Sequence, residues 1–173
     1  ASPLFGQYEP HYTMNFVFNK LPYNPAYAGS KECTDIMAIY RKQWPGLDGA
    51  PTTINATFHT PFANNKCGIG LSLTNDQIGM LNNTFAQLAH AYRIPVGNGT
   101  LSAGIQAELE FARIDWTKAI ALDPNDPNIQ ATASNSTKPN FGVGLYYTNP
   151  RFFAGISAPR FLKTSYYQKG GVS

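Results

Sequence analysis

Charged side chains are scarce in this sequence. Asp, Glu, Lys and Arg together make up 13% of its 173 residues, whereas soluble domains usually carry roughly 25%. No run approaches the roughly 18 consecutive apolar residues that a transmembrane helix requires, so a helical membrane protein is not expected. The net charge of +3 comes from scattered Lys and Arg residues. Without a basic cluster, we expect no nucleic-acid partner.

Cysteines are few as well. Cys33 and Cys67 are the two in the sequence, and neither has a neighbour at metal-ligand spacing, so neither a zinc site nor a redox motif is predicted. A disulfide between them would need an oxidising compartment and a short separation. The sequence therefore leaves two alternatives, two unpaired cysteines or one disulfide between them. The chain starts at Ala1 without a signal-peptide pattern. Either the protein is not exported or its signal has been removed, and the composition favours removal.

Aromatic residues, in contrast, reach 13%. Low charge, abundant aromatics and no long apolar run occur together in transmembrane β-barrels, whose strands turn one face to lipid and the other to a polar interior. The clearest such alternation lies at residues 101–111, where Leu, Ala, Ile and Phe alternate with Ser, Gly, Gln and Glu. At about 3.3 Å per residue, a strand of this length crosses a bilayer at a tilt.

Alternation of the same kind predicts seven strands, at 36–40, 54–62, 69–74, 84–94, 101–111, 141–147 and, less cleanly, 152–161. The turns after the second, fourth and sixth strands are predicted to be short. Those after the first, third and fifth are predicted to be longer or more irregular, with the longest at 118–139. Outer-membrane barrels alternate short periplasmic turns with longer outer loops. This pattern predicts a periplasmic N-terminus and an external loop at 118–139.

The predicted fold class is all-β, an antiparallel transmembrane β-barrel built as a meander. We expect an irregular periplasmic segment at residues 1–30 and barrel strands at 31–173. Seven strands are an awkward number, because bacterial single-chain barrels close with an even count and an open sheet would expose unpaired backbone groups to lipid. The chain is therefore expected to form the N-terminal part of a larger barrel of about 14 strands.

Six stretches of the chain carry a family resemblance, in this order: LPYNPAYAGS (21–30), YRKQWPGLDGAPTT (40–53), GIGLSLTNDQIG (68–79), AYRIPVGNGTLSAGIQA (91–107), PNFGVGLYY (139–147) and FFAGISAPRFL (152–162). In these, nearly the whole chain resembles the PorP/SprF family of Bacteroidetes outer-membrane proteins, which is associated with type IX secretion and gliding motility. Family members are typically longer than this chain, which agrees with a larger barrel.

The resemblance implies a non-enzymatic barrel of the bacterial outer membrane that works without a cofactor. Such a barrel anchors or helps deliver type IX secretion cargo, such as a cell-surface adhesin, and contacts the secretion and gliding machinery. Its partners are then the secretion components, the secreted cargo and the surrounding lipid. An alternative is a pore or transporter barrel for a small solute. A soluble β-sandwich or an outer-membrane enzyme is a third hypothesis.

The candidate partner-binding residues lie in three places: Tyr23, Asn24, Pro25 and Tyr27 in the N-terminal segment, Trp44 and Asp48 in WPGLDG, and Asp123 and Asp126 in the long loop. Prolines and Gly29 are expected to turn the N-terminal segment, which should not be helical and could plug the barrel, brace its mouth or dock a partner. Its tyrosines either bind a partner or pack a plug. Trp44 is expected at a membrane interface.

No catalytic, cofactor-binding or metal residues are predicted. The acidic loop around Asp123 and Asp126 lacks the Gly and the final Glu of an EF-hand, and the three histidines lack zinc spacing. Glu108 and Glu110 lie about 7 Å apart on one strand face, near the spacing of a glycosidase pair. We expect instead that Arg93 on the neighbouring strand pairs with one of them inside the lumen.

Overall fold

A computed structural model describes residues 18–47, 49–115 and 134–162. Its elements are the 3-10 turn η1 (Pro25–Tyr27) and the strands β1 (Asp35–Lys42), β2 (Thr52–Phe62), β3 (Cys67–Ile78), β4 (Leu81–Val96), β5 (Gly99–Ile114), β6 (Ser134–Thr148) and β7 (Phe153–Ala158). Every strand pairs antiparallel with the next one in sequence, in a single seven-stranded sheet. This confirms the predicted antiparallel meander. Within the described ranges, no helix is long and apolar enough to span a membrane.

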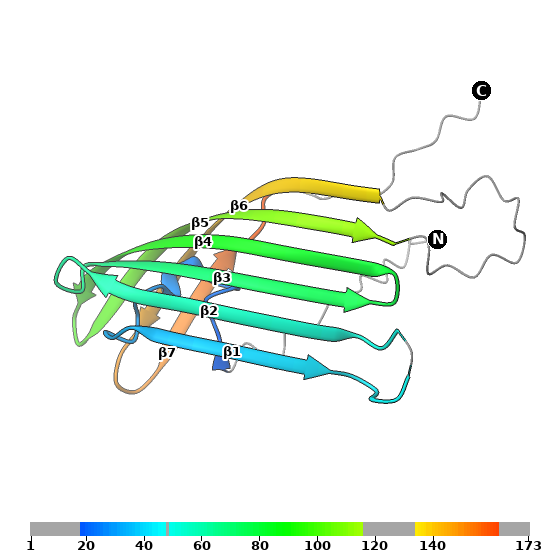
Figure 1. Cartoon of the computed structure of the whole chain (residues 1–173). Coiled ribbons are helices and arrows are strands. Elements are labelled where there is room, and N and C mark those ends of the chain that lie inside the picture. The colour runs from blue at the N-terminus through cyan, green and yellow to red at the C-terminus, as the bar shows by residue number, and fades with distance from the viewer. Residues whose placement is uncertain (1–17, 48, 116–133, 163–173) are drawn as a thin grey trace, which may run out of the picture.

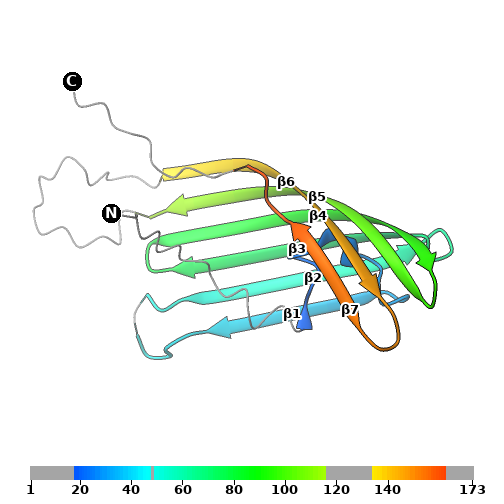
Figure 2. The ribbon, with the colours of Figure 1, turned by 180° about the vertical axis from the view of Figure 1, so that it is seen from behind.

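The sheet is strongly curved and forms a half-barrel (Figures 1 and 2). The segment that precedes β1 lies on its concave side, and β7 has curled round to face the first strands across the hollow. β1 and β7 form the two edges of the sheet.

The convex face is apolar and exposed, the reverse of a soluble protein. A row of register partners across the middle of the sheet shows this, with Ile36, Phe58, Leu71, Leu88, Ala107 and Phe141 on successive strands. The five large side chains of this row are all exposed. Soluble proteins rarely expose an apolar surface of this extent. Exposure of this apolar surface to the acyl chains of a membrane carries no free-energy penalty. The convex face is therefore suited to lipid.

The apolar zone has the height of a bilayer core. On β5 its outer face runs from Leu101 to Phe111. At about 3.3 Å per residue this stretch is about 33 Å long, and a strand tilt of about 40° reduces its height to about 25 Å, the usual height of the lipid-facing band of a barrel. Beyond Phe111 the next outward row is polar, with Lys42, Thr52, Gln77, Asn82, Arg113 and Asn135 on successive strands.

Polar side chains line the concave face, and most are buried. They include Asn55, Thr57 and His59 on β2, Gln87 and Arg93 on β4, and Gln106, Glu108 and Glu110 on β5. The two faces alternate residue by residue, as the sequence pattern predicted. This is the arrangement of a barrel wall, with lipid outside and a polar interior inside.

Two predicted connections are wrong in length. β3 and β4 are joined by a tight turn at Gly79 and Met80, where a longer connection was expected. The polar residues around this turn belong to the strands, because Asn75 donates hydrogen bonds to Asn82 (2.7 Å) and Thr84 (2.9 Å) across the ladder. β6 begins at Ser134 and so takes up the end of the predicted 118–139 loop. Residues 116–133 lie outside the described part.

Candidate functional site

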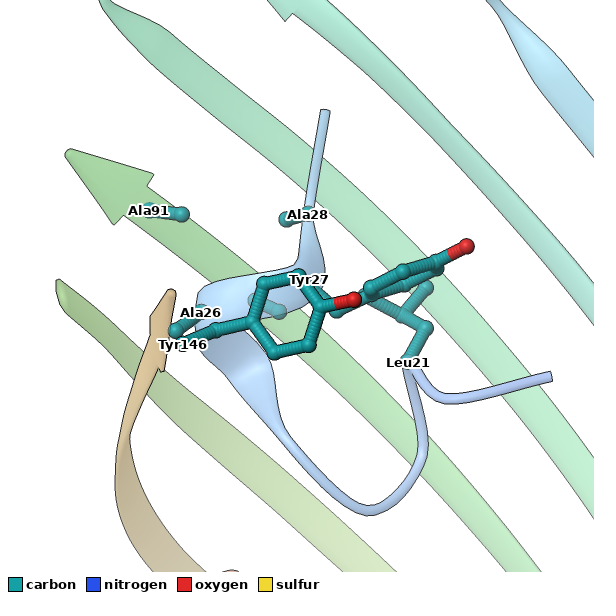
Figure 3. Packing of buried hydrophobic residues seen from close by; sticks show 7 residues of the cluster. Leu21, Ala26, Tyr27, Ala28, Ala91 and Tyr146 are labelled. Carbon is teal, nitrogen blue, oxygen red and sulfur yellow. The ribbon is translucent and has the colours of Figure 1, made fainter. Parts of the chain in front are cut away.

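The candidate site is the segment on the concave face, residues 19–34, here called the strap. An outward limb, 19–23, runs from β2 to β7, and a return limb, 24–29, comes back to β2 (Figure 3). Tyr23 lies at the far end, where its carbonyl accepts a hydrogen bond from Ser157 Oγ of β7 (2.7 Å). The strap then continues through residues 30–34 into β1. It thus touches both halves of the curved sheet.

The turn of the return limb is encoded locally. The side chain of Asn24 accepts a hydrogen bond from the backbone of Ala26 (3.0 Å) and caps η1. Pro25 follows at the first position of the turn, where its fixed φ fits and its missing N–H is not needed. The strap contains no α-helix, and its one helical feature is this three-residue 3-10 turn. After it, Gly29 adopts φ +71°, a conformation that favours glycine.

A row of small residues forms the seat of the return limb. Its members are register partners: Gly68 on β3, Ala91 on β4, Gly104 on β5 and Gly144 on β6. A Cβ atom at Gly104 would overlap the backbone of Pro25 and Ala26, and one at Gly68 would overlap the backbone of Ala28. The strap backbone therefore lies directly on the sheet backbone, which glycine alone permits at these two positions.

Asn24 fixes the return limb to β6. Its Nδ2 donates to the carbonyl of Leu145 (2.9 Å), while its Oδ1 occupies the space that a Cβ at Gly144 would need. One side chain thus caps the turn and ties it to the wall.

Gly29 is held from two strands. Its N–H donates to Nδ1 of His59 on β2 (3.3 Å), and its carbonyl accepts from Nη1 of Arg93 on β4 (2.8 Å). His59 is 1% exposed and Arg93 is 4% exposed. A buried polar group that loses its partner costs about 1–3 kcal/mol, and more if it is charged. The strap therefore satisfies wall residues that would otherwise be unpaired.

Arg93 does not pair with the glutamates of β5, so the predicted lumenal pair is wrong. Its register partner is Ser102, six residues from Glu108, which is about 20 Å along a strand. Its second contact is instead the exposed carboxylate of Glu32, with Nη2 3.6 Å from Oε1.

Both limbs of the strap pack with the wall in a small apolar cluster (Figure 3). Leu21 and Tyr27 of the strap are buried there with Ala89, Ala91 and Tyr146 of β4 and β6. The Tyr27 ring meets those of His59 and Tyr146 edge-on, at centroid distances of 5.4 and 5.5 Å. Such edge-to-face contacts are the favoured arrangement of aromatic rings.

Lys20, at the start of the outward limb, reaches β7. Its ammonium lies 3.5 Å from the centroid of the Phe153 ring, a cation–π contact. Burial lowers the pKa of Lys20 below its ordinary value, and the charge of Lys31 lowers it further. The β7 edge is thus joined to the strap by this contact and by the Ser157 hydrogen bond.

A second inner layer covers the middle of the wall. After β7 the chain turns inward at Pro159, and Nε of Arg160 lies 2.8 Å from Oε1 of Glu108. Gln87 of β4 donates to the other carboxylate oxygen, and the Arg160 guanidinium stacks on the Phe85 ring at 4.6 Å. Glu108 is therefore neutralised within the wall. Its true partner, Arg160, falls inside the predicted strand 152–161, but β7 ends at Ala158, and Arg160 lies in the segment that follows it.

Asn140 lies beyond the last register pair of β6 and β7, Val143 with Ala158. Its Oδ1 accepts from the backbone N–H groups of Phe161 and Leu162 (both 3.0 Å), and its Nδ2 donates to the Leu162 carbonyl (3.0 Å). Beside one remaining backbone hydrogen bond, from the N–H of Phe161 to the carbonyl of Phe141 (3.0 Å), this side chain holds the chain that follows β7.

The predicted partner-binding residues fall into three groups. Asn24, Pro25 and Tyr27 are buried in the strap, and Tyr23 is half-buried at its far end. Trp44 lies far from them in the loop between β1 and β2, is 66% exposed and has φ +47°. The third group, Asp48, Asp123 and Asp126, lies outside the described residues.

Sequence reasoning missed the residues that hold the strap: the glycine row, His59 and Arg93. A signal was present, since Gly68, Gly104 and Gly144 all fall on the polar phase of predicted strands, where side chains were expected. Of the two alternatives for the cysteines, the structure has both free, Cys33 exposed and Cys67 half-buried on the convex face.

Comparison with known protein families shows which family this chain belongs to. The family model described as type IX secretion system membrane protein PorP/SprF matches residues 4–172. The chain belongs to this family. No curated protein and no solved structure matches it. As a PorP/SprF protein, the chain is a membrane component of type IX secretion, and its half-barrel suits the outer membrane.

Proposed function

We propose that this PorP/SprF chain is part of a barrel that holds or helps deliver type IX secretion cargo and contacts the secretion machinery. The observation that carries the proposal is the occupied interior. The strap and the Pro159–Leu162 segment cover the polar face of the wall at two levels. A diffusion pore for a small solute needs that polar face open to water, whereas a holder does not.

Closure of the barrel is part of the proposal. The edges of β1 and β7 lie at the level of the apolar convex rows, where each unpaired backbone group would cost several kcal/mol in lipid. Further strands must therefore pair with both edges. We propose a closed barrel of about 14 strands, of which this chain supplies the N-terminal part.

The proposed orientation places the strap and the short β2–β3, β4–β5 and β6–β7 turns in or near the periplasm. The β1–β2 loop and residues 116–133 then face the cell surface. Two of the three connections at that end support this, since outer loops are the longer ones. The β3–β4 turn at the same end is short and departs from this pattern.

Trp44 is the proposed anchor for cargo. Its loop is tied at the base by hydrogen bonds from Gln43 to Pro51 (2.9 Å) and from Gly79 to Gly49 (3.0 Å). Trp44 holds a left-handed backbone conformation that costs energy for a large side chain, and such strained residues cluster at functional sites. Trp is also prominent among the residues that dominate protein interfaces. Asp48, Asp123 and Asp126 are proposed to extend this surface. Tyr23 is proposed as a machinery contact, and the buried Asn24, Pro25 and Tyr27 would serve by shaping the strap.

The proposal is tested in the native bacterium with the full-length protein. Trp44→Ala is expected to reduce the secreted protein that co-purifies with the barrel and its display on the cell surface, with the barrel amount in the outer membrane unchanged. Tyr92→Ala, on the lipid-facing side of β4, is the matched control and should leave both unchanged. Two results together would contradict a cargo-holding function and support a diffusion pore. They are ion conductance of the purified barrel in planar bilayers and an unchanged amount of secreted protein co-purifying with Trp44→Ala.

A further inference from the structure

The contacts of the strap bear on whether it moves. A segment inside a barrel can be a plug, which leaves to open a passage, or a fixed part of the wall. We infer that the strap is a fixed brace that stays seated while the protein works, so that any passage or cargo contact inside the barrel lies between the strap and the wall opposite. This goes beyond the proposed holder role and does not depend on it.

The first argument is steric. At Gly68 and Gly104 the strap backbone touches the sheet backbone with no side chain between them. The glycine row therefore fits the backbone of the strap closely, with no room for a side chain at these two positions. At Gly29 the fit is equally close from the other side, since a Cβ there would lie 2.9 Å from the Cα of Gly68.

The second argument is the polar wall beneath the strap. Gly29 satisfies the buried His59 and Arg93, and Nδ2 of Asn19 bonds Asn55 (2.8 Å) and Thr57 (3.0 Å). If the strap left, these buried groups would lose their partners together. A mobile plug would instead be expected to rest on water-mediated or exposed contacts, which exchange at little cost.

The third argument is connectivity. Five residues separate Gly29 from Asp35, the first residue of β1. Contacts hold this short segment at both of its ends. Thr34 bonds Thr60 (2.9 Å), and Asp35 lies 3.3 Å from His59 and 2.9 Å from Lys31. The strap cannot swing out at this end without pulling on a strand of the wall. The strap joins β1 directly, since its last residue, Thr34, is followed by Asp35 of β1.

The test measures protection of the wall beneath the strap in living cells. Cys33 and Cys67 are replaced by Ser, and Thr57→Cys places a thiol under Asn19, while Glu32→Cys places an exposed control thiol on the strap itself. A small membrane-permeant maleimide is expected to label Thr57→Cys roughly tenfold more slowly or slower still than Glu32→Cys, because labelling follows the open population. The slow rate should be equal in secreting cells and in cells without the secretion machinery. Fast labelling that depends on secretion would overturn the inference.

A second variant keeps the test decisive if Thr57→Cys perturbs folding. Asn19→Cys combined with Thr57→Cys, in the same background, is expected to be joined by a short, reducible bis-thiosulfonate cross-linker, because Nδ2 of Asn19 lies 3.0 Å from Oγ1 of Thr57. Secretion and barrel amount should then be the same before and after reduction. Loss of secretion in the cross-linked form that reductant restores would show a moving plug, and failure to cross-link in a folded barrel would show that the strap is not seated here.

Discussion

Nη1 of Arg93 lies 2.8 Å from the carbonyl oxygen of Gly29, although the two residues are 64 positions apart. The arginine is buried in β4, and the glycine belongs to a segment that crosses the concave face of the sheet. The wall and its inner covering are therefore one structure. The outer surface of a membrane barrel faces lipid, so hydrophobic burial away from water does not stabilise the wall from that side. Interior contacts such as this one must contribute to the stability of the fold.

Arg93→Ala should destabilise the barrel by about 2 kcal/mol, since it removes a charge-assisted hydrogen bond and leaves the Gly29 carbonyl unpaired. Arg93→Lys should recover part of this loss, because lysine can make one of the two contacts. The measurement is urea unfolding in lipid vesicles. Lys42→Ala, on the exposed polar row, is the control. Equal midpoints for Arg93→Ala and Lys42→Ala would show that the strap contact contributes nothing.

Gly104→Ala should destabilise the barrel by about 1–3 kcal/mol, because the added Cβ would overlap the Pro25 and Ala26 backbone. The matched control is Gly70→Ala on β3, where the added atom meets side chains rather than backbone, the two Cδ atoms of Leu21 at 2.7 and 2.9 Å and the Cβ of Ala28 at 3.4 Å, so a smaller loss is expected. The temperature at which each variant unfolds is measured by gel electrophoresis, in which the folded and the unfolded barrel migrate differently. If they melt together, the backbone contact of strap and sheet is not present.

Arg160→Ala should cost about 3 kcal/mol, because it leaves the carboxylate of Glu108 buried without its cation. Glu108→Gln should restore much of the stability in that background, since it removes the charge while still fitting beside Gln87. A double-mutant cycle by urea unfolding measures this coupling. Additive effects would mean that the two residues do not pair in the lipid-embedded protein.

Cys33 is a natural reporter of orientation, because it is exposed at the end of the barrel where the strap enters β1. A membrane-impermeant maleimide should label it only after the outer membrane is permeabilised, as expected for a periplasmic position. Cys33→Ser is the control and identifies any signal from Cys67. Labelling of Cys33 in intact cells would reverse the proposed orientation.

Much of the sheet could be predicted from sequence because a barrel wall imposes strict alternation. Residues 101–111 alternate without a break, and β5 extends only a few residues beyond them. The strand ends around Asn75 and Asn82 were missed because polar residues near a membrane interface resemble a loop, although here they bond to one another.

The interior was less predictable for a different reason. Which residue meets Glu108 depends on how the chain turns after Pro159, and the seat of the strap depends on a register across four strands. Neither is a local property. The glycines on the polar phase of the strands were the one local sign, since a polar interior has no need of glycine unless something lies against it.

The central claim is that the convex face meets lipid and the concave face is covered from within. Spin labels placed one at a time at residues 101–111 of β5 other than Gly104, in a background lacking both cysteines and in lipid vesicles, test it most directly. Odd-numbered positions from 101 to 111 should be accessible to oxygen dissolved in the lipid and protected from a water-soluble nickel reagent, and even-numbered positions should be protected from lipid-dissolved oxygen. Accessibility without a two-residue period, or with the two faces reversed, would contradict the account.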